Sequence, residues 1–246
     1  EDIVRGFEVG AVDYVAKPFN AHELLARVRT HLALDQLYRE NQRLLLNVLP
    51  ASIAEKLKKQ PGVIAERVDD ASVRFADIVG FTPLSARKSP SELLEWLNRV
   101  FSGFDELAGR RGLEKIKTIG DAYMVAGGLP EPHPDHLAEM AALALEMLES
   151  IRKIGGEFGG LKLRIGLHTG SVIAGVIGIR KFIYDVWGDT VNTASRLESH
   201  GAPERIQVSE TVFQRLQNRF VFEPRGIIEL KGRGPMKTYF LNSPKP

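Results

Sequence analysis

Residues 71–82 read ASVRFADIVGFT, and this stretch indicates the fold class most directly. Ala71, Val73 and Phe75 alternate with polar residues, which is the two-residue period of a β-strand. The strand is expected to end at Asp77, where the alternation stops. The main domain therefore contains a strand that carries an acidic residue at its end.

Downstream of this strand the sequence changes repeatedly between helical and strand periods. Apolar residues between 93 and 107 recur at three and four positions, which predicts an amphipathic helix that starts near Ser89 or Ser91. The other expected elements are a hairpin of strands at 114–118 and 122–126, a helix at about 135–154, strands near 162–168 and 182–186, and a helix from about Thr190. This order indicates an α/β or α+β class.

A different pattern precedes the main domain. A short helix, a strand at 13–17 and a stop at Pro18 are expected first. Asn20 is a suitable N-cap, and Glu23 three residues later completes the signature of a capping box. Residues 21–49 contain no Pro or Gly, so an unbroken helix of about 40 Å is expected at about 1.5 Å per residue.

This helix carries a heptad pattern. The a and d positions of two heptads are occupied by Leu34, Leu37, Asn41, Leu44 and Val48. Apolar a and d residues with one polar Asn at an a position predict a short, parallel, two-stranded coiled coil. A helix packed on its own domain is the alternative, because only two heptads are present.

The composition excludes several classes of protein. The 246 residues are 43% hydrophobic and 26% charged, which is typical of a globular chain. A net charge of +2 is too balanced for a dedicated nucleic-acid binder. The absence of cysteine excludes disulfides and zinc–thiolate sites and fits a reducing cytoplasm. No apolar run of about 18 residues occurs, so a cytoplasmic chain without a membrane segment is expected.

Two acidic residues are candidate metal ligands. Asp77 and Asp121 each stand at the end of a predicted strand beside a turn, so both could lie at one edge of the sheet. Two neighbouring carboxylates need a cation, and oxygen ligands suit Mg²⁺ or Mn²⁺ when phosphates complete the shell. The spacing alone is equally consistent with a helix cap at Asp77 and a turn residue at Asp121.

Four cationic residues are candidate phosphate ligands, although each alone is also typical of a solvated surface. Arg164 falls in a predicted strand and Lys117 in the hairpin. Arg196 follows Asn192 by four residues, so both project from one side of a helix. Lys231 precedes a glycine, which permits a close approach of the backbone to a ligand.

Five motifs occur in the order and approximate spacing of class III adenylate and guanylate cyclases. They are FADIVGFT at 75–82, EKIKTIGDAYM at 114–124, LRIGLHTG at 163–170, YDVWGDTVNTASRLES at 184–199 and LKGRGPMKTYFL at 230–241. The sequence strongly resembles this family over about residues 66–242. The resemblance implies an α+β sandwich of ferredoxin-like or palm type, with a central, mostly antiparallel sheet flanked by helices and a helical coiled-coil linker before it.

A shorter resemblance lies upstream. DYVAKPF at 13–19 is similar to the last strand of a response-regulator receiver, with Tyr14 at the switch aromatic and Lys17 at the lysine of that family. If the rest of a receiver precedes this sequence, the resemblance implies an upstream sensor kinase as a partner. The alternative is that the helix after this strand serves only as a dimer stalk. The expected organisation is a receiver fragment at 1–30, a helical dimerising linker at 31–65 and a cyclase domain at 66–246.

The cyclase resemblance implies a role for each candidate. Asp77 and Asp121, with the backbone carbonyl of Ile78, match residues that bind two divalent metal ions, Mg²⁺ or Mn²⁺. The remaining matches are Arg196 with the arginine that meets charge on the α-phosphate, Asn192 with the residue that orients the ribose, and Arg164 and Lys231 with residues that contact the triphosphate.

Two residues decide the base. Lys117 and Asp185 match the Lys and Asp of adenylate cyclases, whereas guanylate cyclases typically carry Glu and a small residue such as Cys. A donor and an acceptor complement the N1 acceptor and the N6 amino group of adenine. The resemblance therefore implies conversion of ATP to cyclic AMP and pyrophosphate. The alternatives are a guanylate cyclase and a catalytically inactive, nucleotide-binding signalling module.

The family places its active site between two catalytic domains. The metal residues and Arg164 come from one copy, and the second copy supplies Lys117, Asp185, Asn192, Arg196 and Lys231. One chain carries both halves. A homodimer with two equivalent sites is therefore implied.

Overall fold

The computed structural model describes residues 2–60, 62–86, 88–155, 160–178 and 182–246. The chain divides into two compact units, residues 1–54 and residues 55–246. None of the helices in the described segments is both long enough and apolar enough to cross a bilayer.

The second unit is built on an eight-stranded sheet, counted over the described residues. Its strands are β1 Ile64–Val79, β2 Glu114–Ile119, β3 Ala122–Gly127, β4 Lys162–Ile177, β5 Ile183–Trp187, β6 Ile206–Ser209, β7 Phe220–Leu230 and β8 Gly234–Pro244. The order is β2-β3-β1-β4-β6-β8-β7, and β5 pairs with β4. Among the strand pairs of the described residues only β4–β6 is parallel, which confirms the predicted α+β class with a mostly antiparallel sheet.

The described helices lie before the sheet and between its strands. They are α1 Asp2–Glu8, α2 Ala21–Leu46, α3 Ala51–Lys59, α4 Phe81–Ser85, α5 Pro90–Arg110, α6 His136–Gly155, α7 Asp189–Ser199 and α8 Glu210–Leu216. At α5 the side chain of Ser89 accepts from the backbone N–H of Glu92, and the Glu92 carboxylate accepts from the backbone N–H of Ser89. This reciprocal cap fixes Ser89, and not Ser91, as the start of the helix.

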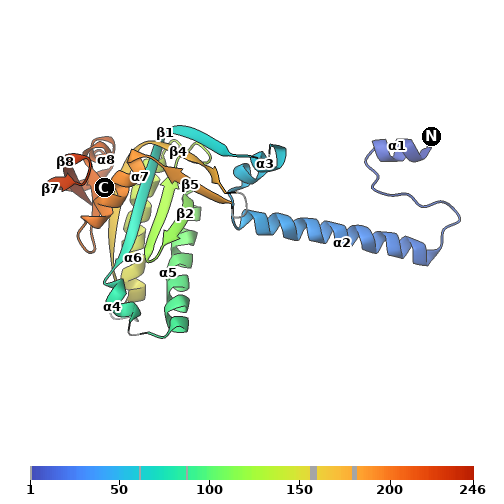
Figure 1. Ribbon diagram of the computed structural model, residues 1–246, viewed down its shortest axis with the longest axis horizontal. Helices are drawn as coiled ribbons and strands as arrows, with labels where there is room; N and C mark the ends of the chain where they lie inside the picture. Colours follow the sequence, from blue (N-terminus) through green and yellow to red (C-terminus); the bar gives the residue numbers. More distant parts are fainter. Residues whose placement is uncertain (1, 61, 87, 156–159, 179–181) are drawn as a thin grey trace. The chain divides into compact units, whose positions relative to one another are not determined.

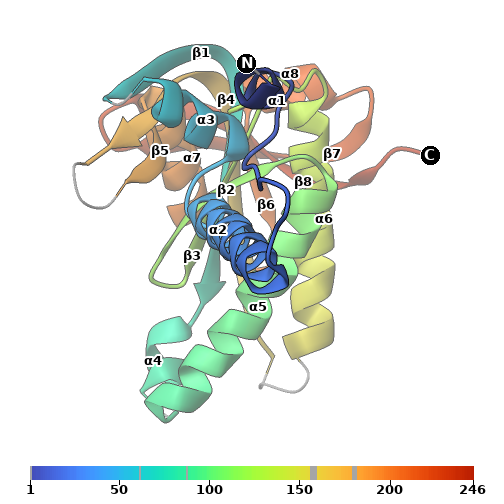
Figure 2. The ribbon, with the colours of Figure 1, turned by 90° about the vertical axis from the view of Figure 1, so that its right-hand side faces the viewer.

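Helices α5 and α6 lie side by side along one face of the sheet (Figures 1 and 2). Their apolar residues pack with one set of alternate residues from β4, including Leu163, Ile165 and Leu167. Phe104 and Met147, from α5 and α6, are fully buried in this core. Each side chain of this size contributes about 1.5–3 kcal/mol through burial, so this layer stabilises the sheet.

Helix α7 packs on the opposite face of β4. Gly166 belongs to the other set of alternate residues in that strand, and a Cβ there would lie 2.1 Å from the backbone nitrogen of Glu198. The helix therefore lies directly on the strand, and residues of α7 are held at fixed positions above β4.

The first unit differs from expectation in its strand, in its capping box and in the end of its long helix. The strand predicted at 13–17 is absent, because no described segment pairs with this stretch; Asp13 instead accepts from Arg27 at 3.0 Å. Asn20 does cap α2, accepting from the backbone N–H of His22 at 2.8 Å. Glu23 does not complete a capping box, because its carboxylate accepts from Arg27.

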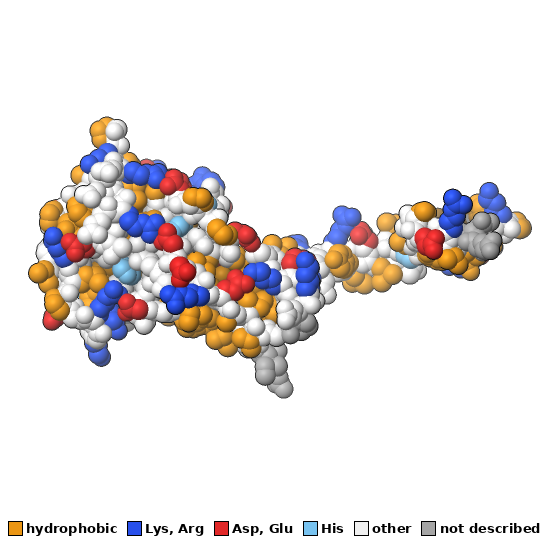
Figure 3. Space-filling model, turned by 90° about the horizontal axis from the view of Figure 1, so that it is seen from above, with side chains coloured by type: hydrophobic (Ala, Val, Ile, Leu, Met, Phe, Trp, Pro, Cys, Tyr) orange, Lys and Arg blue, Asp and Glu red, His pale blue; other side chains and the backbone are white. Residues whose placement is uncertain are grey.

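Helix α2 ends at Leu46, three residues before the expected end. None of its residues is buried, and hydrophobic side chains lie at the surface of the segment that contains it (Figure 3). The heptad residues Leu34, Leu37 and Leu44 are all more than half exposed. The coiled coil stays a prediction, for which the structure supplies the helix and its exposed apolar residues.

Candidate active site

The two predicted metal ligands are neighbours. Asp77 lies two residues before the end of β1, and Asp121 lies in the turn that joins β2 to β3. Burial, followed by the nearby carboxylates of Asp121 and Glu198, raises the pKa of Asp77 to about 6. Carboxylates that disfavour each other's charge are suited to a cation that neutralises them.

The donor set fits the implied ions when phosphates complete the shell. Among the described residues no cluster of three or more His, Cys, Asp or Glu side chains could hold a metal ion alone. Mg²⁺ commonly binds through one or two carboxylates together with substrate phosphates. Asp77, Asp121 and the backbone carbonyl of the buried Ile78 match that requirement.

Arg164 lies beside the aspartates. It stands opposite Asp77 in the β1–β4 register, and its Nη2 donates to Asp77 Oδ2 at 3.1 Å. Its Nε donates to Glu198 Oε1 at 2.7 Å. The guanidinium is thus fixed between a strand carboxylate and a helix carboxylate, which are charge-assisted contacts of the stronger kind.

Lys117 and Asp185 form a second cluster. The Lys117 Nζ donates to Asp185 Oδ2 at 2.5 Å, and Oδ1 of the same carboxylate accepts from the backbone N–H of Val186 at 2.8 Å. The side chains are 36% and 13% exposed, so the aspartate is largely buried and the lysine is accessible. A cationic donor and an anionic acceptor stand side by side at one accessible position.

The third cluster joins α7 to the turn between β7 and β8. Asn192 and Arg196 lie one turn apart on α7. A Cβ at Gly232 would lie 3.6 Å from Nη2 of Arg196, which places the turn that carries Lys231 beside this arginine. Arg233 of the same turn donates to Asp189 and to the hydroxyl of Thr193 on α7.

The nine predicted site residues therefore fall into three clusters. The first holds Asp77, Ile78, Asp121 and Arg164; the second holds Lys117 and Asp185; the third holds Asn192, Arg196 and Lys231. Among the residues that the structure describes, no hydrogen bond or ion pair joins one cluster to another. One chain supplies every predicted residue, in three groups that no hydrogen bond or ion pair among the described residues connects.

Two contributing residues were missed from the sequence. Glu198 lies four residues after Ala194 on the buried face of α7, and an acid at an inward helical position is a signal for a buried ion pair. Arg233 lies in the LKGRG motif two residues after Lys231, but only the fold shows that it contacts α7.

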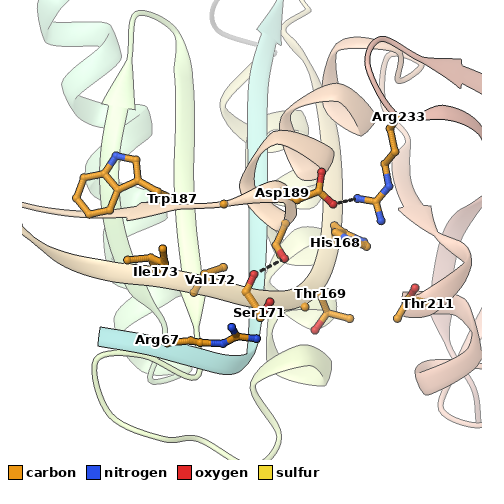
Figure 4. A pocket seen from close by; sticks show the side chains of 13 residues that line it. Arg67, His168, Thr169, Ser171, Val172, Ile173, Trp187, Asp189, Thr211 and Arg233 are labelled. Carbon is orange, nitrogen blue, oxygen red and sulfur yellow. Dashed lines mark hydrogen bonds and ion pairs between the residues drawn. The ribbon is translucent and has the colours of Figure 1, made fainter. Parts of the chain in front are cut away.

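A pocket of about 510 Å³ lies at the N-terminus of α7, and none of the nine predicted residues lines it. Figure 4 shows Asp189 and Arg233 paired at its margin, with Trp187 and Ile173 at its other end. His168 lines it and is buried, which lowers the pKa of this imidazole to about 4 and keeps it neutral. The pocket lies next to the third cluster, but Asn192, Arg196 and Lys231 do not line it.

Comparisons with known proteins agree on one family. The family described as the adenylate and guanylate cyclase catalytic domain matches residues 63–243. An "Adenylate cyclase" of Mycobacterium tuberculosis is 47% identical over 215 residues, which are 87% of this chain and 48% of that protein. Human "Atrial natriuretic peptide receptor 2" is 42% identical over 228 residues, which are 90% of this chain and 22% of the receptor. The chain thus spans about half the length, or less, of these curated relatives.

A solved structure gives the same result. The guanylate cyclase domain of RhGC from Catenaria anguillulae, in complex with GTP, superposes with a TM-score of 0.70 at 37% identity. The match covers 73% of this chain and 100% of that domain. Proteins named for adenylate and for guanylate cyclase are therefore both similar to this chain.

Proposed function

The chain belongs to the adenylate and guanylate cyclase catalytic domain family, and on that premise we propose that it converts ATP to 3′,5′-cyclic AMP and pyrophosphate. The contact between Lys117 and Asp185 is the observation that carries the choice of nucleotide. Adenine offers a ring acceptor at N1 and an amino donor at N6, which a lysine and an aspartate complement. Guanine reverses these groups at N1 and O6, so the same pair would leave buried groups unpaired.

The reaction joins the ribose 3′-oxygen to the α-phosphorus, breaks the bond to pyrophosphate and releases the hydroxyl proton to water. Divalent ions, when bound by Asp77, Asp121 and the Ile78 carbonyl, supply activation of the hydroxyl and neutralisation of the departing pyrophosphate. Arg196 stabilises the charge that develops on the α-phosphate. The ribose is oriented by Asn192, and the triphosphate is held by Arg164 and Lys231, so that the attack is in line.

The three separate clusters support a homodimer as the active form. Domains of this family function as dimers, and a two-fold axis would bring the metal cluster of one copy to the other two clusters of the second copy. The exposed heptad residues of α2 would hold the two copies parallel. The receiver resemblance at 13–19, the upstream sensor kinase and the three-segment organisation stay predictions.

Incubation of the purified chain with equal ATP and GTP, with Mg²⁺ or Mn²⁺ and product identification by mass spectrometry, tests the proposed function. Cyclic AMP and pyrophosphate should dominate. Cyclic GMP as the main product would make the chain a guanylate cyclase instead. Nucleotide binding without any product would support the inactive signalling module.

Mixing two inactive variants tests the composite site. Asp77→Ala and Arg196→Ala each place one lesion in both sites of a homodimer, so neither alone should be active. A mixed dimer carries both lesions in one site and leaves the other intact. Random pairing makes half the dimers mixed, so co-expression should restore roughly a quarter of wild-type activity. No recovery, with dimers intact by sedimentation, would place both residues in one copy's site.

A further inference from the structure

The buried carboxylate of Glu198 has no role in the reaction described above. It lies on α7 with its side chain 9% exposed, and Oε1 accepts from Nε of Arg164 at 2.7 Å. Its Oε2 accepts from the hydroxyl of Ser199 at 3.1 Å. Burying a carboxylate is costly unless it is paired, so this contact is a built feature of the fold.

The guanidinium of Arg164 is held by a helix and by a strand. Its Nε is taken by Glu198 from the helix, while its Nη2 reaches Asp77 Oδ2 on the strand at 3.1 Å. Its aliphatic stem lies against Gly201, where a Cβ would come within 2.7 Å of Arg164 Cγ. The side chain is therefore held along its length, and few rotamers remain to it.

Because Arg164 is shared between Glu198 and Asp77, its hold on the metal ligand Asp77 is limited. A planar guanidinium that loses its Nε partner can turn to form two parallel hydrogen bonds with a single carboxylate. Asp77 is the carboxylate within reach. In such a pairing both oxygens of Asp77 would be occupied by Arg164 and would compete with a cation. With Glu198 present, the only oxygen of Asp77 that contacts Arg164 is Oδ2.

We propose that Glu198 is a positioning residue that holds Arg164 at the triphosphate and prevents it from closing over Asp77, so that Asp77 stays available to a divalent cation. The inference rests on the proposed function for the identity of the substrate. The pairing of Arg164 with both acids is a property of the chain itself. Glu198 touches neither substrate nor metal in this scheme and acts only through Arg164.

Three variants test the role. Glu198→Ala removes the acceptor, and Glu198→Gln keeps an oxygen for Nε but removes the charge that balances the guanidinium. Glu146→Ala is the matched control, because Glu146 accepts from Nε of Arg111 at 3.2 Å in an ion pair on the far side of the sheet. Removing it takes away an arginine partner of the same kind, remote from Asp77.

Two kinetic readouts separate positioning from general loss of structure. Glu198→Ala should lower kcat/KM for ATP by about 10- to 100-fold, the scale of losing an oriented charged contact. It should also raise, by about 10-fold, the Mg²⁺ concentration that gives half-maximal activity. Glu198→Gln should show the same changes at about 3- to 10-fold. Glu146→Ala should leave kcat/KM and the half-maximal Mg²⁺ concentration within two-fold of wild type, even if its melting temperature is lower.

Metal binding supplies a readout that needs no turnover. Mn²⁺ titrated into the dimer with 3′-deoxy-ATP, followed by the paramagnetic resonance signal of free Mn²⁺, should bind more weakly to Glu198→Ala than to wild type. Equal Mn²⁺ affinity and unchanged half-maximal Mg²⁺ in both Glu198 variants would overturn the proposal. So would an equal loss in Glu146→Ala. If Glu198→Ala does not fold, Glu198→Gln decides alone. If wild type forms no cyclic nucleotide, the proposed function fails, while the Mn²⁺ titration still decides the role of Glu198.

Discussion

Replacing Asp77 by Asn should stabilise the metal-free protein and abolish its activity. In the absence of a cation, Asp77 is partly buried and lies near the carboxylates of Asp121 and Glu198, and together these raise its pKa from 3.8 to about 6. The contact with Arg164 offsets only part of this effect. Ionised Asp77 therefore lowers the free energy of unfolding, because its charge is disfavoured in the folded chain and not in the unfolded chain.

The size of this cost follows from the difference in pKa between the two states. A difference of about two pH units, at about 1.4 kcal/mol each, gives an upper value of about 3 kcal/mol at pH 7. The side chain is 21% exposed, and solvent screening reduces the cost. We expect the Asp77→Asn variant to gain about 1–2 kcal/mol in the free energy of unfolding, since the amide resembles the neutral acid.

The pH dependence fixes the sign of the effect. An acid whose folded pKa is raised takes up its proton in the folded state first, as pH falls through about 6, and in the unfolded state only near 3.8. Stability of the wild-type chain therefore rises, relative to the variant, as pH falls across this window. The gain of Asp77→Asn should be largest at pH 7 to 8 and should nearly vanish near pH 4.

Urea unfolding in EDTA, at pH 7.5 and at pH 4.5, measures this gain. Asp69→Asn is the control, because Asp69 is 81% exposed and pairs with Arg67 at the surface. Its unfolding free energy should change by no more than about 0.5 kcal/mol. A variant at Asp77 that is less stable than wild type at pH 7.5, or whose gain does not shrink at pH 4.5, would refute the reasoning.

Three further predictions concern the base-reading pair, a buried arginine and the N-terminal helix. Lys117→Glu combined with Asp185→Cys should raise the ratio of GTP to ATP in kcat/KM, and an unchanged ratio would mean that these residues do not read the base. Arg74 is fully buried, its Nε and Nη2 lack a described partner, and desolvation lowers its pKa to about 9. Arg74→Met should therefore raise the unfolding free energy by about 1–3 kcal/mol in urea, and a loss would show that the cation is paired. Trimming residues 1–49 should make specific activity fall with dilution, which a concentration-independent rate would contradict.

The periodicity of the sequence was sufficient to predict the strands and the turn that carry the two acids. The alternation before Asp77 and the turn at Asp121 indicated that two acids could lie at one sheet edge. In the structure Asp121 is near enough to contribute to the raised pKa of Asp77, while their role as metal ligands stays a prediction. The helix start near Ser89 or Ser91 was also predicted, and the structure places the cap at Ser89. The capping box predicted at Asn20 and Glu23 forms only its Asn20 half, because Glu23 accepts from Arg27. Local pattern therefore identified the strands and helices that carry Asp77, Asp121 and Arg164. It did not identify β6, α8, β7 and β8, which follow α7.

The misses are features that depend on distant segments. The stretch at 13–17 has strand-forming residues, but a strand forms only where another segment pairs with it. Arg74 alternates with apolar neighbours as a surface residue would, yet β1 is central and both of its faces are covered there. Glu198 required knowledge that Arg164 lies beneath α7. Each of these features depends on which distant segment packs against the residue. The spacing of residues within one helix or strand does not carry that information.

Helix α7 connects the two halves of the proposed reaction. Successive residues of an α-helix are rotated by about 100°, so Asn192 and Arg196 share one side while Glu198 lies roughly opposite Arg196. Glu198 faces β4 and Arg164, in the metal cluster, and Arg196 faces the turn of Lys231. In the proposed two-fold dimer these sides would belong to different active sites. Because Gly166 leaves no space beneath the helix, a displacement of α7 would move Arg196 in one site and Arg164 in the other together, so the two sites of a dimer would be coupled through this helix.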